Sequence, residues 1–215
     1  MNDKLTEIVF ILDRSGSMAG LEDDTVGGFN AMVEKQKKEE GEALLSAVLF
    51  NHESAVLYDR VDIRKVEPMT DRQYSVGGCT ALLDAIGGAV HHIANVHKYA
   101  REEDRPAKTV FVIITDGMEN ASRRYGSDEV QRMVKHEREK YGWEFLFLGA
   151  NMDAIAAARS FGIRDDRAVR YKSDRGGTAL NYDVVGEAVS CLRRENAIRA
   201  DWRAPIEADV KKRGK

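Results

Sequence analysis

The sequence has only two cysteines, and no part of it approaches the 18 consecutive apolar residues that a membrane-spanning helix requires. Cys79 and Cys191 lie far apart and form no CxxC pair, which excludes a disulfide framework and is typical of reduced thiols. The charged N-terminus leads into a short apolar run that ends at Asp13, unlike a signal peptide. We therefore expect a cytoplasmic protein with no membrane anchor.

A strong charge of one sign is also missing. The 33 Lys and Arg residues nearly balance the 36 Asp and Glu residues, for a formal net charge of -3, so no nucleic-acid surface is predicted. The arginine pairs at 123–124 and 193–194 are far apart and are expected on solvated helix faces. His91, His92 and His97 share one predicted helix without the i, i+4 spacing of a metal pair, so no second metal site is expected there.

Three continuous apolar runs stand out, at residues 8–12, 110–114 and 145–148. They are rich in β-branched or aromatic residues and end at Asp or Gly, which favours strands buried on both faces. Residues 43–50 and 55–61 predict two more strands. Only four residues separate them, so they must form an antiparallel hairpin, because a parallel pair needs a long crossover. Residues 168–171 predict a last short strand.

Helical patterns separate these strands, at residues 26–33, 82–93, 130–134, 155–161 and 180–192. Strands alternating with helices predict an α/β fold of three layers, with a mostly parallel sheet covered on both faces and one antiparallel edge strand. A single domain over residues 1–195 is expected. For the polar segment 196–215 a frayed end is favoured over a C-terminal helix.

Oxygen-bearing side chains follow two of the buried strands. Asp13 is followed by Ser15 and Ser17, and Asp116 ends the run that begins at residue 110. Ligands of open α/β sheets bind beyond the carboxyl ends of strands, where the strand order reverses. If the two strands are neighbours at that point, both carboxylates face one crevice. A Gly-Gly-Cys-Thr segment brings Thr80 as a third hydroxyl.

These five donors, three hydroxyls and two carboxylates, are all hard oxygens. They suit Mg²⁺, or Mn²⁺ or Ca²⁺, and not zinc, which prefers Cys and His. Three neutral hydroxyls do not balance a dication, so an acidic ligand from outside would bind well. If the two carboxylates do not both coordinate the ion directly, they neutralise less of its charge, and the ion stays electrophilic. The pattern therefore predicts a metal site that binds an acidic group of a ligand, and it does not predict a hydrolytic site.

The same residues resemble the von Willebrand factor type A (vWA) domain family, also called integrin I-like domains. Its metal-ion-dependent adhesion site (MIDAS) has a D-x-S-x-S segment, a distant Thr and a distant Asp, in the order of Asp13, Ser15, Ser17, Thr80 and Asp116. The apolar strand before Asp13 and the segments 77–86 and 113–117 match too. The resemblance covers residues 5–195. It implies a six-stranded sheet of order 3-2-1-4-5-6 and an open metal position that takes a Glu or Asp of a partner protein.

Each of these residues also has an ordinary reading. The two aspartates suit caps of loops or helices, the two serines suit turns, and Thr80 suits the N-cap of the helix that follows it. The surrounding residues carry weaker expectations. Glu119 and Asn120 are candidates for the rim of the crevice, Arg14 and Met18 for contacts with a partner, Asn151 for a helix N-cap, and Asp84 for stabilising the first turn of its helix.

A metal-dependent phosphohydrolase is the alternative function. Such enzymes of the haloacid-dehalogenase kind need D-x-D, with the second Asp as acid and base, whereas Ser15 occupies that position here. No GxxxxGK[ST] or strand-linked G-x-G-x-x-G segment predicts nucleotide binding. No histidine follows a strand near Ser15 or Ser17, as Ser-His-Asp catalysis would require. We therefore expect a protein-binding module and not an enzyme.

Overall fold

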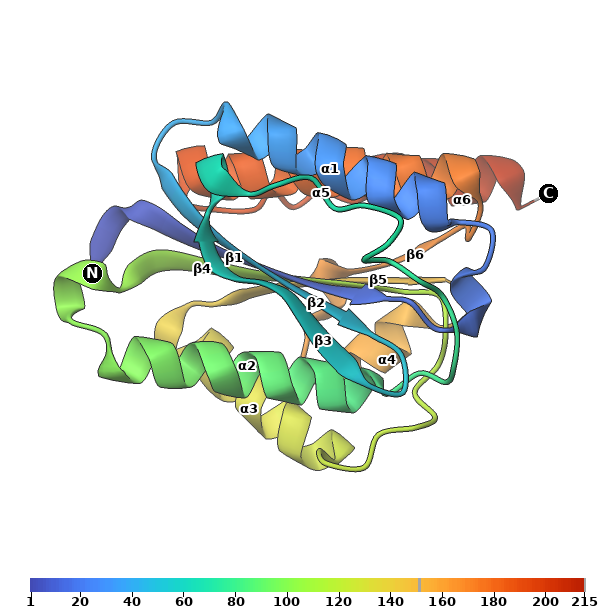
Figure 1. The fold of residues 1–215 in the computed structure, drawn as a ribbon, viewed down its shortest axis with the longest axis horizontal. Helices are drawn as coiled ribbons and strands as arrows, with labels where there is room; N and C mark the ends of the chain where they lie inside the picture. Colours follow the sequence, from blue (N-terminus) through green and yellow to red (C-terminus); the bar gives the residue numbers. More distant parts are fainter. Residues whose placement is uncertain (151, 215) are drawn as a thin grey trace.

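A computed structural model describes residues 1–150 and 152–214 as a three-layer α/β/α sandwich (Figure 1). Its strands and α-helices follow the predicted alternation and are, in chain order, β1 (Asn2–Asp13), α1 (Glu22–Lys37), β2 (Glu42–Phe50), β3 (Ser54–Asp62), α2 (Leu82–Tyr99), β4 (Pro106–Thr115), α3 (Ser127–Tyr141), β5 (Glu144–Ala150), α4 (Ala154–Ser160), β6 (Ala168–Tyr171), α5 (Arg175–Glu195) and α6 (Ala204–Arg213). None of the helices in these described residues combines the length and apolar character needed to cross a bilayer.

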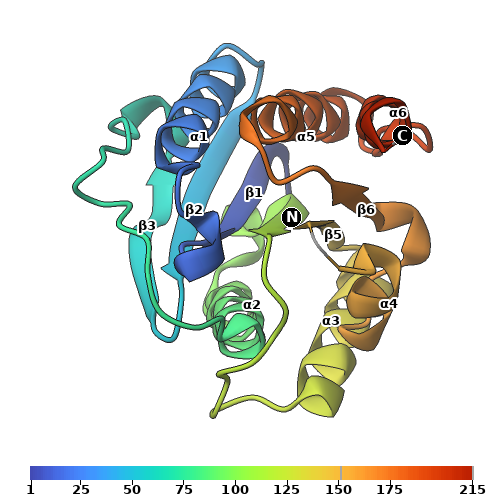
Figure 2. The same ribbon diagram turned by 90° about the vertical axis from the view of Figure 1, so that its right-hand side faces the viewer.

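The sheet has the order β3-β2-β1-β4-β5-β6, which confirms the predicted topology. All neighbouring strands run parallel except β2 and β3, so β3 is the expected antiparallel edge strand. The chain leaves β1 toward one side of the sheet and leaves β4 toward the other. The carboxyl ends of β1 and β4 therefore form the switch point of the fold, and Figure 2 looks onto this edge of the sheet.

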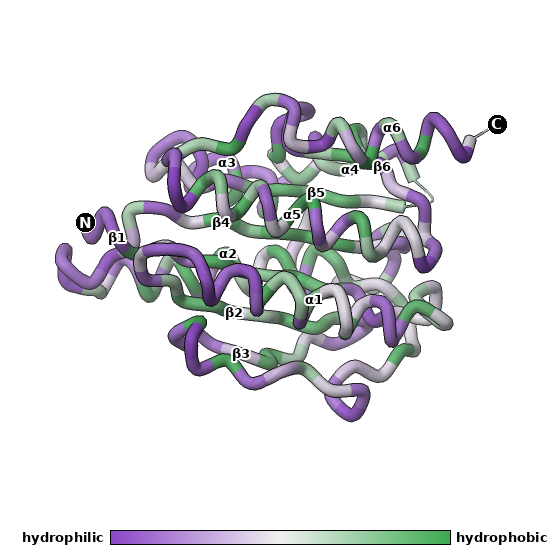
Figure 3. Tube along the Cα trace, turned by 90° about the horizontal axis from the view of Figure 1, so that it is seen from above, coloured by the Kyte–Doolittle hydropathy of each residue, from purple (hydrophilic) through white to green (hydrophobic). Residues whose placement is uncertain are grey.

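Successive side chains along each strand point to opposite faces of the sheet, which creates two separate hydrophobic cores. Ile8, Phe10 and Leu12 of β1 face the layer of α1 and α5, while Val9 and Ile11 face the layer of α2, α3 and α4. Burial on both faces explains why the central strands are continuous apolar runs. In Figure 3 the strands are predominantly hydrophobic, whereas the helices alternate between hydrophobic and hydrophilic residues.

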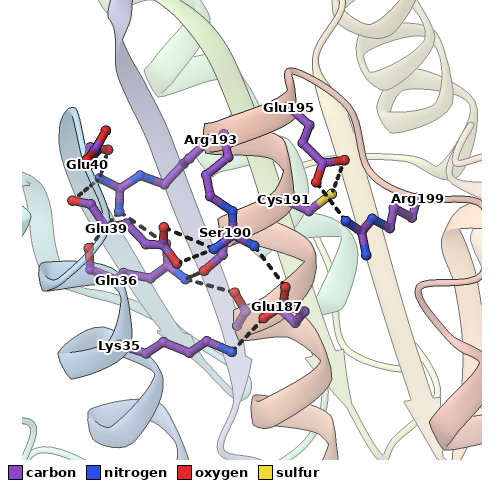
Figure 4. Close-up of polar contacts among 12 residues, drawn as sticks. Lys35, Gln36, Glu39, Glu40, Glu187, Ser190, Cys191, Arg193, Glu195 and Arg199 are labelled. Carbon is purple, nitrogen blue, oxygen red and sulfur yellow. Dashed lines mark hydrogen bonds and ion pairs between the residues drawn. The ribbon is translucent and has the colours of Figure 1, made fainter.

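Helices α1 and α5 pack closely against each other. A Cβ atom at Gly28 would lie 2.3 Å from the Tyr182 ring, so only glycine permits this approach. At the other end of the pair, Arg193 is 7% exposed and its guanidinium is bonded to the end of α1 (Figure 4). The expectation of a solvated Arg193 is therefore wrong, because a carbonyl-lined pocket takes up its charge. Arg194 is exposed on α5. Arg123 and Arg124 are exposed too, but they lie in the loop before α3 and not on a helix as predicted.

Helix α6 occupies much of the segment for which the sequence favours a frayed end. It lies beside α5 and packs on β6 (Figure 2). Ile206 is 1% exposed, and the buried Trp202 donates from Nε1 to the Asp166 carbonyl at 2.9 Å. Pro205 stands in the first turn, where its missing N–H costs nothing. A few apolar anchors thus order a segment that is polar by composition.

Candidate metal centre

The two strand-end aspartates lie at the switch point between β1 and β4. Asp13 is the last residue of β1, and Asp116 directly follows β4. The strands are paired side by side up to Leu12 and Ile114, so both carboxylates reach the same edge of the sheet. Both residues are buried. The structure therefore places these two predicted residues together, as the expected topology required.

The serine loop folds back over this edge as a short 3₁₀ turn, Gly16–Met18. The Ser15 N–H donates to Asp13 Oδ1 at 2.7 Å, which fixes the start of the turn. The hydroxyl oxygens of Ser15 and Ser17 are 3.1 Å apart, and the Ser17 hydroxyl donates to Asp116 Oδ1 at 2.5 Å. The Ser17 side chain thus points toward Asp116, and the Ser15 hydroxyl lies beside that of Ser17.

Thr80 completes the group from the segment that precedes α2. A Cβ atom added at Gly117 would lie 2.8 Å from Thr80 Oγ1, 3.3 Å from Ser17 Oγ and 3.6 Å from Ser15 Oγ. Three hydroxyl oxygens from two separate loops therefore surround one small space. Gly117, the residue after Asp116, leaves this space open because it has no side chain. All five predicted site residues are brought together here.

The Asp13 carboxylate is held by protein donors on both oxygens. Its Oδ1 accepts from the Ser15 N–H, and its Oδ2 accepts from the Thr115 hydroxyl at 2.6 Å. Burial raises the pKa of Asp13 above its ordinary value, and the hydrogen bonds from Thr115 and Ser15 offset only part of this rise. With both oxygens engaged, Asp13 anchors the serine loop to the sheet.

Three residues that sequence reasoning missed support the aspartates. Thr115 contacts Asp13, the Tyr74 hydroxyl donates to the Asp13 main-chain carbonyl, and the Ser173 hydroxyl donates to Asp116 Oδ2 at 3.1 Å. Thr115 carried a signal, because it is a polar residue directly after a run of five apolar ones. Tyr74 and Ser173 come from distant loops, and nothing in their local sequence points to this contact.

The loop after Asp116 is locked to the start of α2. Asn120 Oδ1 accepts from the Thr80 N–H at 2.9 Å, and the Asn120 N–H donates to the Thr80 carbonyl at 3.0 Å. Glu119 accepts from the Leu83 N–H at 2.8 Å and so caps the helix. Asn120 thus holds Thr80 in place and Glu119 holds the start of α2, while both remain at least partly exposed beside the site. Thr80 is not the N-cap, since that position belongs to Ala81.

Four other expectations have mixed outcomes. Asp84 lies in the first turn of α2, as expected, and its carboxylate also accepts from the N–H groups of residues 123–125, so it holds the neighbouring loop as well. Met18 is 2% exposed and is unavailable to a partner, while Arg14 is partly exposed. Asn151, expected to cap a helix, lies outside the described residues, and the Asp153 side chain caps α4.

The donor chemistry fits a hard divalent cation. Within residues 1–150 and 152–214, no group of three or more His, Cys, Asp or Glu side chains is placed to hold a metal. A cation at this centre would depend on the hydroxyls of Ser15, Ser17 and Thr80, which are hard oxygen ligands. His52 packs over the nearby Gly78, a neighbour that sequence reasoning did not foresee.

No protein-family model matches the chain, and no curated protein matches it by sequence. Solved structures do. Proximal thread matrix protein 1 from the mussel byssus, with a zinc-occupied MIDAS motif, has a TM-score of 0.58 and 15% identity over 86% of this chain and 46% of its own. A von Willebrand factor type A protein from Catenulispora acidiphila has a TM-score of 0.57 and 13% identity over 86% and 42%.

The vWF domain of the type V pili tip protein Mfa5 from Porphyromonas gingivalis has a TM-score of 0.58 and 11% identity, over 86% of this chain and 94% of that domain. The chain thus spans less than half of the first two matched structures and nearly all of the third. At these identities the likeness establishes the fold. The protein has the three-layer fold of vWA domains.

Proposed function

We propose that the protein is a binding module that holds a divalent cation, Mg²⁺ by preference, and uses it to capture a Glu or Asp of a partner protein. One observation carries the proposal. The hydroxyl oxygens of Ser15, Ser17 and Thr80 lie around the space that Gly117 leaves open. The mussel protein with the same fold has a zinc-occupied MIDAS motif, which supports a divalent cation at this edge of the sheet.

Magnesium suits the donor set better than zinc. Mg²⁺ prefers six oxygen ligands and keeps several waters, so a few hydroxyls and carboxylates are sufficient to bind it. All five side chains offer oxygen, and none offers sulfur or imidazole. The zinc ion of the mussel protein is an example of a divalent cation bound by this fold. The preference for Mg²⁺ in this chain is argued from its donor atoms alone.

An acidic partner follows from the charge at the centre. The two carboxylate oxygens of Asp13 accept hydrogen bonds from the Ser15 N–H and the Thr115 hydroxyl, and those of Asp116 accept from two serine hydroxyls. Both carboxylates are therefore already bonded to protein donors. A dication bound mainly through neutral hydroxyls keeps a large part of its charge. A carboxylate from another protein would neutralise it and occupy an open coordination position. The proposed setting is the cytoplasm.

The same contacts speak against hydrolysis. A phosphohydrolase of the D-x-D kind needs a free aspartate nucleophile and a second carboxylate two residues on. Asp13 is buried and engaged on both oxygens, and residue 15 is a serine whose hydroxyl cannot act as a general acid near neutral pH. We therefore propose binding without turnover.

Metal titration and partner capture test the proposal together. We expect isothermal titration to detect Mg²⁺ and Mn²⁺ binding to the wild type and a loss of about tenfold or more in Thr80→Ala, with Ser160→Ala, at an exposed serine far along the chain, as the matched control. Immobilised protein should retain partners from lysate in Mg²⁺ and release them in EDTA. Phosphate release that Asp13→Ala abolishes would support the enzyme instead.

A further inference from the structure

Asp116 links the metal centre to the C-terminal part of the chain. Its Oδ1 accepts from Ser17, and its Oδ2 accepts from Ser173 at 3.1 Å. Ser173 lies in the short loop between β6 and α5 and is not one of the five residues of the motif. A carboxylate with one hydroxyl donor on each oxygen is fixed in its rotation. Ser173 therefore helps to set the orientation of the Asp116 carboxylate, which would face a bound cation.

The loop that carries Ser173 has little freedom. Asp174 caps α5, since its Oδ1 accepts from the Gly177 N–H at 2.9 Å. A Cβ atom at Gly177 would lie 2.0 Å from the Lys172 carbonyl oxygen, so only glycine permits this tight turn. The strand end on one side and the capped helix on the other thus confine Ser173 between two fixed elements.

Helix α6 braces the same loop from outside. Arg213, in the last turn of α6, donates to Asp174 Oδ2 at 2.5 Å and also pairs with Asp209 of its own helix. The start of α6 is anchored to β6, because Arg203 donates to the Ala168 carbonyl at 2.6 Å. The helix therefore connects the strand before the loop with the helix cap after it.

We propose that Ser173 is a positioning residue of the metal centre, and that α6 holds it in place through the Arg213–Asp174 pair. The inference rests on the proposed function, and it assigns a role to residues beyond 195, which sequence reasoning left outside the domain. Residues that orient metal-binding carboxylates typically contribute about 10–100-fold to metal affinity. The Arg213–Asp174 pair is partly exposed, so its effect through Ser173 is smaller, about two- to fivefold.

The experiment measures Mn²⁺ affinity of the full chain by electron paramagnetic resonance, together with thermal unfolding in EDTA. We expect Ser173→Ala to weaken Mn²⁺ binding by about 10–100-fold with little change in metal-free unfolding. Ser173→Thr, which keeps the hydroxyl, should restore most of the affinity. Ser160→Ala and Arg199→Gln, which remove an exposed serine and an exposed i, i+4 ion pair, should bind Mn²⁺ like the wild type.

A double-mutant cycle tests the part played by α6. Arg213→Gln should weaken Mn²⁺ binding by about two- to fivefold in the wild type and have no effect in the Ser173→Ala background, since the pair acts through Ser173. An equal effect in both backgrounds would overturn the role of α6. Wild-type affinity in Ser173→Ala would overturn the positioning role and leave the proposed function standing. A wild type that binds no Mn²⁺ would overturn both.

Discussion

Arg193 on α5 donates a 2.7 Å hydrogen bond to the main-chain carbonyl of Gln36 near the end of α1 (Figure 4). The same guanidinium also contacts the carbonyls of Glu40 and Gly41 at 3.2 and 3.3 Å. Gln36 belongs to the last turn of α1, and Glu40 and Gly41 follow the helix, so Arg193 contacts carbonyls at the end of α1, where the regular helical hydrogen bonds stop. One buried side chain thus caps α1 and fastens α5 to it.

Replacing Arg193 should therefore destabilise the fold strongly. Arg193→Ala removes a buried charged side chain together with its hydrogen bonds to the carbonyl and the side-chain oxygen of the buried Gln36, which should cost about 3 kcal/mol in the free energy of unfolding. Arg194→Ala is the matched control. The Arg194 side chain is itself exposed, and its ion pairs with Glu39 and Glu187 should contribute less than about 1 kcal/mol. Urea denaturation measures both. Equal losses in the two variants would contradict the capping role.

Gly117 offers a direct test of the proposed cation position. Gly117→Ala places a methyl group 2.8 Å from Thr80 Oγ1, among the three hydroxyls. Mn²⁺ affinity measured by titration should fall by about tenfold or more, while the free energy of unfolding without metal should fall by only about 1 kcal/mol.

The control for this variant is Gly88→Ala. Nothing lies within 4 Å of a Cβ atom at Gly88, and the residue is in the middle of α2. This substitution should raise stability by about 0.5–1 kcal/mol, because alanine loses less conformational freedom than glycine, and should leave Mn²⁺ affinity unchanged. Unchanged affinity in Gly117→Ala as well would mean that the cation does not bind among these hydroxyls.

The fold could be predicted from the sequence wherever burial dictates composition. Strands β1, β4 and β5 lie between two helix layers, so their apolar runs are continuous and identify them. The three residues between β2 and β3 allow only a hairpin. The sequence does not predict α6, because this helix is stabilised by Trp202, Ile206 and a few ion pairs and has no apolar stripe.

Some residues of the candidate site can be predicted from the sequence, and others cannot. Its five motif residues are recognisable because their spacing in a turn or at a strand end has a direct structural meaning. Tyr74 and Ser173 reach the site through tertiary contacts between distant loops, which local sequence does not encode. The same limit applies to Arg193, because its neighbour Arg194 is exposed and nothing in the sequence separates the two.

Two buried tyrosines, Tyr74 and Tyr182, should respond differently to loss of the hydroxyl. The Tyr74 hydroxyl donates to the Asp13 carbonyl, whereas the Tyr182 hydroxyl has no partner among the described residues. Tyr74→Phe leaves a buried carbonyl without its donor and should cost about 1–2 kcal/mol of unfolding free energy. Tyr182→Phe removes a buried polar atom and should leave stability unchanged or raise it by about 1 kcal/mol.

Thermal unfolding of both variants measures the contrast. Because Tyr74 holds the end of β1, Tyr74→Phe should also weaken Mn²⁺ binding, and Tyr182→Phe should not. Similar destabilisation in the two variants would mean that the Tyr74 contact with Asp13 contributes nothing specific.

Asp84 should make the loop after β4 sensitive to acid. Burial raises the pKa of Asp84, but the N–H groups of residues 123–125 outweigh it and hold the pKa below its usual 3.8. A carboxyl whose folded-state pKa is lowered adds stability above its unfolded pKa, and this stability is lost as the pH falls through the folded pKa. The contribution should be complete near neutral pH and absent well below pH 3.8.

Asp84→Asn tests this dependence. It keeps the shape of the side chain but removes the charge, and should cost about 1–2 kcal/mol at pH 7, since hydrogen bonds to a charged acceptor are stronger. Urea unfolding followed between pH 7 and pH 3 should show the two proteins converging as the wild-type carboxyl becomes protonated. A gap that stays constant through pH 3 would show that the loss comes from packing, because a purely steric effect does not titrate.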